Sequence, residues 1–126
     1  DHAAQGAIEA REILKKMGFP KEKIETVCKC ILLHDKKEDL PNIKEVRVLK
    51  EADGLEAVGA MGIARYFSFN GERNIWGASS LPIKELIRNA NSDYFKLPIA
   101  IELAKKKKKI TKEFCDAFIK EYNMEN

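Results

Sequence analysis

The sequence predicts an all-α fold, with residues 1–126 forming a single compact helical domain. Apolar residues recur every three or four positions along most of the chain, which is the period of helices that bury one face. No stretch keeps the strict alternation of apolar and polar residues that is typical of a strand. A chain of 126 residues without internal repeats or linkers is also long enough to bury a hydrophobic core.

The composition narrows the class of protein. Hydrophobic residues make up 44% and charged residues 34%, a balance typical of globular proteins rather than of disordered chains. The apolar runs are too short to cross a bilayer, and no signal peptide is visible. The net charge of +3 is too small to indicate nucleic-acid binding. The cysteines lack metal or redox spacing, which favours reduced, structural thiols in a cytoplasmic protein.

The helices can be placed in order along the chain. A first helix is expected at about residues 2–17, ended by Gly18, and a second at about 21–34. A third helical region covers residues 46–67 and bends near Gly54 or Gly59. Residues 69–82 are rich in Gly, Asn and Ser and predict a loop. A short helix at 82–89 and one or two helices between 94 and 122 complete the domain.

The lysine run and two of the glycines are expected to have structural roles. The run Lys105 to Lys109 is flanked by apolar residues that keep one helix face free of lysine, so we expect solvated charges rather than a phosphate-binding patch. Gly59 and Gly62 are expected to permit close helix packing.

An aspartate interrupts the apolar stripe of the third region. At helical spacing the stripe contains Val46, Leu49, Asp53, Ala57, Ala60, Ala64 and Phe67. A buried carboxylate without a partner would cost several kcal/mol, so Asp53 is expected to have a bound cation or several hydrogen-bond donors. The side chain of Arg47, Lys50 or Arg65 could pair with the Asp53 carboxylate. Asp53 could also cap a helix that begins at Gly54.

Both histidines extend apolar stripes of the first two helices. His2 begins the stripe Gly6, Ala10, Ile13 and Met17, and His34 follows the stripe Ile24, Val27 and Ile31. With Asp53, each helical region then carries one potential metal ligand on its core-facing side. Two imidazoles and one carboxylate suit Mn²⁺, Fe²⁺ or Zn²⁺ better than Ca²⁺. Separate structural roles for the three side chains remain an equal alternative on spacing alone.

Three segments resemble one known family. They are "DHAAQGAIEAREILKKMG", "IETVCKCILLHD" and "EVRVLKEADGLEAVGAMGIARYF", and the C-terminal helix adds a weaker likeness. Together they resemble the HD-domain superfamily of metal-dependent phosphohydrolases, in particular its branch of small uncharacterised hydrolases. The third segment, with its Ala-Asp-x-Leu core, is long and ordered enough to be the strongest signal.

The resemblance implies a role for each candidate residue. Asp53 matches the distant Asp that completes the family's metal site, whereas His2 and His34 match two extra histidines that hold a second metal or the phosphate. The adjacent His34 and Asp35 offer an alternative register, but Asp53 follows Asp35 by only 18 positions, fewer than the family's pattern requires. The first His and the true His-Asp pair are therefore expected before Asp1, in a longer chain of which these residues form the C-terminal part.

The implied activity is hydrolysis of a phosphate ester or anhydride, with a nucleotide among the candidate substrates. One or two divalent ions (Mn²⁺, Fe²⁺, Mg²⁺ or Zn²⁺) would be the cofactor, and Asp53 the catalytic ligand. Arg65 would either neutralise substrate charge or brace its helix. We expect a small phosphorylated substrate and neither specific nucleic acid nor membrane as a partner. Glu51 keeps an acid where many members have Asp, whereas Gly54 replaces the Arg that usually follows the ligand Asp. The missing Arg and the short connector at residues 35–42 favour the alternative, a non-catalytic HD-like binding or regulatory module.

Overall fold

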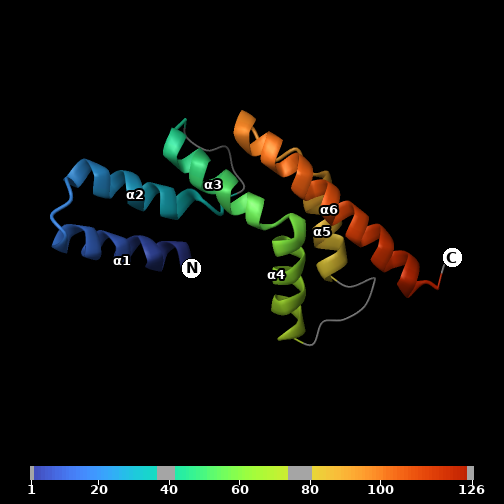
Figure 1. Ribbon diagram of the computed structural model, residues 1–126. Helices are drawn as coiled ribbons and strands as arrows, with labels where there is room; N and C mark the ends of the chain where they lie inside the picture. The colour runs from blue at the N-terminus through green and yellow to red at the C-terminus, as the bar shows by residue number, and fades with distance from the viewer. Residues whose placement is uncertain (1, 37–41, 74–80, 125–126) are drawn as a thin grey trace. The chain divides into compact units, whose positions relative to one another are not determined.

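A computed structural model describes residues 2–36, 42–73 and 81–124. These residues form helices and no strand, which confirms the all-α prediction (Figure 1). The helices are α1 (His2–Lys16), α2 (Lys21–Leu33), α3 (Lys44–Glu56), α4 (Gly59–Gly71), α5 (Leu81–Asn91) and α6 (Pro98–Tyr122). The chain divides into two compact units, Asp1–Asp53 and Gly54–Asn126. Most of the expected loop at 69–82 lies outside the described residues, although α4 continues to Gly71.

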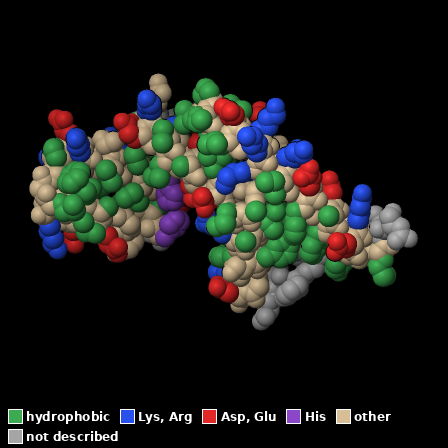
Figure 2. All heavy atoms as spheres, viewed as in Figure 1, with side chains coloured by type: hydrophobic (Ala, Val, Ile, Leu, Met, Phe, Trp, Pro, Cys, Tyr) green, Lys and Arg blue, Asp and Glu red, His purple; other side chains and the backbone are tan. Residues whose placement is uncertain are grey.

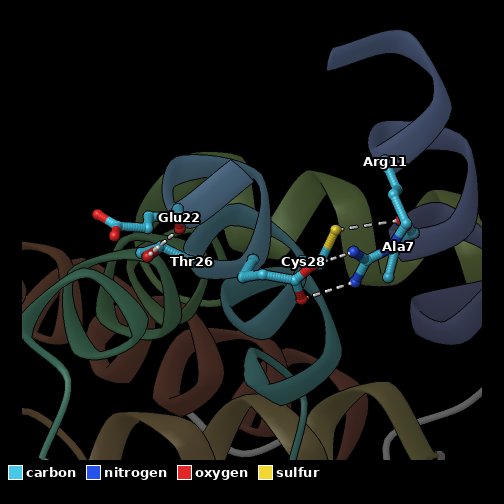
Figure 3. Close-up of polar contacts among 6 residues, drawn as sticks. Ala7, Arg11, Glu22, Thr26 and Cys28 are labelled. Carbon is cyan, nitrogen blue, oxygen red and sulfur yellow. Dashed lines mark hydrogen bonds and ion pairs between the residues drawn. The ribbon is translucent and has the colours of Figure 1, made fainter. Parts of the chain in front are cut away.

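Helices α1 and α2 form a hairpin in the first unit (Figure 1). Gly18, with φ of 74°, ends α1 in the left-handed conformation that glycine adopts at little cost. The buried core of the hairpin is Ala7, Ile24 and Cys28, with Leu14 and Ile31 packed against it. The small side chain of Ala7 lets the helices approach closely, and the Cys28 thiol donates to the Ala7 carbonyl at 3.4 Å (Figure 3).

The face that α1 buries differs from the predicted one. Ala3 and Ala7 are buried, whereas Ile13 and Met17 are 55% and 65% exposed. The prediction followed the larger apolar side chains, but the close approach to α2 selects the small residues one position away. On α2 the predicted stripe is closer to the observed face, because Ile24 is buried and Ile31 packs against the core.

A bidentate ion pair joins the two helices of the hairpin. Arg11 Nη1 donates to Glu25 Oε1, and Arg11 Nη2 donates to Glu25 Oε2 at 3.0 Å. This hydrogen bonding lowers the pKa of Glu25 and raises that of Arg11. The paired geometry fixes the orientation of both side chains across the hairpin.

The predicted stripe through Asp53 is wrong. Val46 is fully buried and Glu51 is 2% exposed, whereas Asp53 is exposed and Leu49 is 39% exposed. The covered face of α3 therefore follows a different row of residues, and the buried acid is Glu51. The second half of the stripe, from Ala57 onward, follows the end of α3 at Glu56. Helical spacing therefore no longer places these residues on the same face as Val46.

The break between α3 and α4 confirms one of the two predicted bends. Gly59 has a φ of 80° and begins α4 directly after the break. A Cβ on Gly62 would come 2.5 Å from the carbonyl carbon of Ala57. Gly59 and Gly62 therefore allow the chain to turn tightly between α3 and α4, which agrees with the expectation that they permit close packing.

The second unit is built from α4, α5 and α6, which pack against one another. Its buried residues on α5, α6 and the connection between them include Ile83, Leu86, Ala90, Phe95, Ala100, Ala104 and Cys115. On α4 the buried residues are Gly59, Gly62 and Asn70. The amide of Gly59 donates to the buried Thr111 hydroxyl at 2.8 Å, which attaches the start of α4 to α6. Asn89 Nδ2 donates to the Tyr66 hydroxyl at 2.8 Å and joins α5 to α4.

Two lysines of the basic run are not simply solvated, which corrects the expectation for that segment. Lys107 Nζ donates to the Leu55 carbonyl at 2.9 Å. Lys108 Nζ donates to the Ser92 carbonyl, and burial lowers its pKa. Both side chains are half-buried, whereas Lys105, Lys106 and Lys109 are exposed. The carbonyl groups at the C-terminal end of a helix attract cations, so Lys107 and Lys108 bind carbonyl groups at the ends of neighbouring segments.

Among the helices described here, none is both long and apolar enough to cross a bilayer.

Candidate functional site

The structure brings the two histidines together. His2 is the first residue of α1 and His34 is the C-cap of α2, so the hairpin places them at the same end. Their rings meet edge to face, with centroids 5.5 Å apart and planes at 83°. Figure 2 shows the purple histidine side chains in contact at the surface. Sequence reasoning placed these residues on helix faces, and the antiparallel pairing of α1 and α2 makes them neighbours.

The backbone fixes the tautomer of His34. Its Nδ1 lies 2.6 Å from the carbonyl oxygen of Ile31, and a carbonyl can only accept. Nδ1 therefore carries the proton when the ring is neutral, and the lone pair is on Nε2. A hydrogen bond from one ring nitrogen to a backbone carbonyl is the usual support for a histidine whose other nitrogen binds a metal. His34 thus fits the chemistry of a metal ligand.

Asp35 lies beside His2 in the same cluster. The distance from His2 Nε2 to Asp35 Oδ2 is 3.8 Å, and the His2 side chain is 76% exposed. This separation is longer than a hydrogen bond, and exposed ion pairs of this kind contribute little stability. Asp35, the acid of the alternative His-Asp register, therefore lies close to His2.

Asp53 lies in the last turns of α3 and is exposed. Its carboxylate therefore stays solvated and needs no buried cation or hydrogen-bond donor, which corrects the expectation from the apolar stripe. Across residues 2–36, 42–73 and 81–124, no three or more His, Cys, Asp or Glu side chains form a group that could hold a metal ion. His2 and His34 thus supply a pair of imidazoles, and the described arrangement does not complete the ligand set.

Arg65, the candidate for substrate binding, projects from α4 into solvent. Its Nη1 donates to Glu56 Oε2 at 3.1 Å, and the two side chains are 58% and 51% exposed. An exposed ion pair of this type is weak, so the guanidinium could exchange Glu56 for another anion. The pair also joins the end of α3 to α4, which is the bracing role considered from the sequence.

Two features near Asp53 were not found from the sequence. Glu51 is buried, with Arg47 Nη1 at 3.6 Å from its Oε1. Next to Asp53, the Tyr94 ring fills the space around Gly54, where a Cβ would come 2.4 Å from Cε1 of the ring. Any larger side chain at position 54 would displace Tyr94. The helical period could have indicated a covered Glu51, but the approach of Tyr94 depends on the tertiary fold.

Comparisons with known proteins place the fold in a class. No protein-family model and no curated protein matches the chain. Among solved structures, the chain is similar to the crystal structure of Bacillus subtilis YpgQ, with a TM-score of 0.76 and 25% sequence identity. The match covers 91% of this chain and 63% of the YpgQ chain. The chain therefore has an HD-like, all-α fold and spans about 63% of the length of the protein that it matches.

Proposed function

We propose that this protein is a divalent-metal-dependent phosphohydrolase that acts on a phosphate ester or anhydride. The observation that carries the proposal is the His2–His34 pair, in which the Ile31 carbonyl leaves Nε2 of His34 as the free ligand atom. The fold similarity to YpgQ, at a TM-score of 0.76, and the resemblance of the segment around Asp53 to HD hydrolases support it.

The proposal gives each residue a distinct task. His34 Nε2 and His2 would bind a divalent ion or donate to phosphate oxygens, and Asp53 would be an anionic ligand. A bound ion would polarise a phosphoryl oxygen and lower the pKa of a bound water. Arg65, released from Glu56, would neutralise substrate charge. These roles need only side chains that are exposed or half-buried in the structure.

The substrate is expected to be a small phosphorylated molecule, with nucleotides among the candidates, in a cytoplasmic setting. The test is an assay of the protein at its full natural length. Phosphate release from a panel of nucleotides and simple phosphate esters would be measured with Mn²⁺, Mg²⁺ or Zn²⁺ and again with chelator. Release that requires a divalent ion supports the proposal. Metal-independent release, or no release from any panel member with every ion, contradicts it.

A second candidate is a non-catalytic HD-like module that binds a ligand without hydrolysing it. The specific observation in its favour is that the described His, Cys, Asp and Glu side chains form no group able to hold a metal. The Tyr94 ring at Gly54 adds to this, because it fills the space where HD hydrolases usually have Arg. Binding of a nucleotide without turnover, with or without metal, would select this alternative.

A further inference from the structure

A small cavity in the second unit uses none of the residues considered above for hydrolysis. Its volume is about 260 Å³, and it lies between the start of α6 and the segment that precedes that helix. Its lining residues are Asp93, Phe95, Ile101, Ala104, Lys105 and Lys108. Phe95 and Ala104 belong to the hydrophobic core, so the floor of the cavity is apolar.

Charged groups surround this apolar floor. Lys105 and Lys108 are three residues apart on α6, so both lie on the same side of the helix. The Lys108 ammonium lies 5.3 Å from the centroid of the Phe95 ring and donates to the Ser92 carbonyl. These contacts fix the ammonium at the edge of the cavity. An ammonium has three N–H donors, so Lys108 keeps donors for a second acceptor.

We propose that this cavity binds a small organic monoanion, a carboxylate with an apolar body. The apolar part would lie on Phe95 and Ala104, and the carboxylate would accept hydrogen bonds from Lys105 and Lys108. A volume of about 260 Å³ is just below the range of roughly 300–1,000 Å³ that is usual for drug-sized ligands. The occupant is therefore a compact molecule such as an arylacetate.

Asp93 moderates the attraction for anions. It lines the same cavity as Lys105 and Lys108, and both Asp93 and Lys112 act electrostatically on the Lys108 ammonium. Because the Asp93 carboxylate offsets part of the attraction that the lysines exert, a second negative charge on the ligand would gain little. The apolar floor, which inorganic phosphate cannot cover, then favours an organic carboxylate over phosphate.

The test is titration of the protein with phenylacetate, followed by two-dimensional NMR of the backbone amides. We expect saturable shifts that are largest around Phe95 and Ala104. Lys108→Met should weaken phenylacetate binding about tenfold, because it removes one charge-assisted hydrogen bond while keeping the apolar stem. Lys106→Met is the matched control, since Lys106 is exposed on the same helix and does not line the cavity.

The outcomes separate this inference from the hydrolase proposal. Inorganic phosphate should not cause the same shifts, and Asp93→Asn should increase its binding. Shifts spread over the whole surface, equal binding by Lys108→Met and wild type, or equal responses to phosphate and phenylacetate would overturn the inference. If Lys108→Met fails to fold, Lys105→Met replaces it, because the Lys105 side chain is exposed. None of these results depends on hydrolytic activity.

Discussion

The imidazole rings of His2 and His34 meet edge to face with their centroids 5.5 Å apart. One residue begins α1 and the other caps α2, so their contact depends on the length of the hairpin and on its antiparallel pairing. The Ile31 carbonyl accepts from His34 Nδ1 and orients the ring. The pair is thus a fixed feature of the hairpin end to which a metal ion or a phosphate could bind.

Metal binding should depend on this histidine pair. His34→Gln should weaken Mn²⁺ binding at least about tenfold, measured by calorimetry on the protein at its full natural length, because a direct ligand atom is lost. Asp35→Asn is the matched comparison, since Asp35 lies beside His2 but belongs to the alternative register. Loss of affinity in Asp35→Asn together with unchanged affinity in Asp53→Asn would show that the alternative register is correct.

The tight turn between α3 and α4 makes a prediction for stability. Gly62→Ala should lower the free energy of unfolding by about 1–3 kcal/mol, because its Cβ would overlap the Ala57 backbone. Gly71→Ala is the control, since no atom lies within 4 Å of a Cβ there, and it should be neutral or stabilising by up to about 1 kcal/mol. Denaturant titrations of both variants measure the difference. Equal effects on the free energy of unfolding would show that a Cβ at position 62 meets no crowding from Ala57.

The ion pair between Arg11 and Glu25 should make stability depend on pH. Its hydrogen bonds lower the pKa of Glu25, so folding favours the charged carboxylate. The stabilisation is present above the unfolded pKa of about 4.3 and is lost as the pH falls through the lower, folded value. The melting temperature of Glu25→Gln should therefore lie below that of wild type near neutral pH and converge with it in acid.

Thermal melts followed by circular dichroism at a series of pH values measure this convergence. Glu12→Gln is the control, because Glu12 is exposed on α1 and its carboxylate is not in the Arg11 pair. A difference between Glu25→Gln and wild type that stays constant through the acid range would show that the carboxylate charge is not what the pair contributes.

Much of the fold follows from local signals in the sequence. Gly18 and Pro20 end one helix and begin the next, and Gly59 breaks the third helical region where its φ of 80° requires glycine. These features act within a few residues, so the helix bounds could be predicted closely. Which face a helix buries is decided by its neighbours instead. Ala7 is buried and Ile13 exposed because α1 approaches α2 too closely for a larger side chain.

The candidate site could be predicted only in part. The residue types and the family resemblance selected His2, His34 and Asp53, but the stripe argument placed Asp53 in the core, whereas it is exposed. Within α3 the covered face includes Val46 and Glu51 instead, and after the end of α3 at Glu56 helical spacing no longer relates the residues to one face. The contact of His2 with His34 depends on the pairing of two helices. The approach of Tyr94 to Gly54 joins residues that are 40 positions apart in the sequence. Neither can be read from a local pattern.

In the proposed function, Asp53 is a metal ligand of a phosphohydrolase. The most direct test is Asp53→Asn in the protein at its full natural length, assayed with Mn²⁺ on the most active phosphate ester. We predict that kcat/KM falls about 100-fold or more, while the melting temperature in chelator is unchanged because Asp53 is exposed. Hydrolysis that survives in proportion to folded protein, or a large fall in that melting temperature, would contradict the claim and make Asp53 a structural residue.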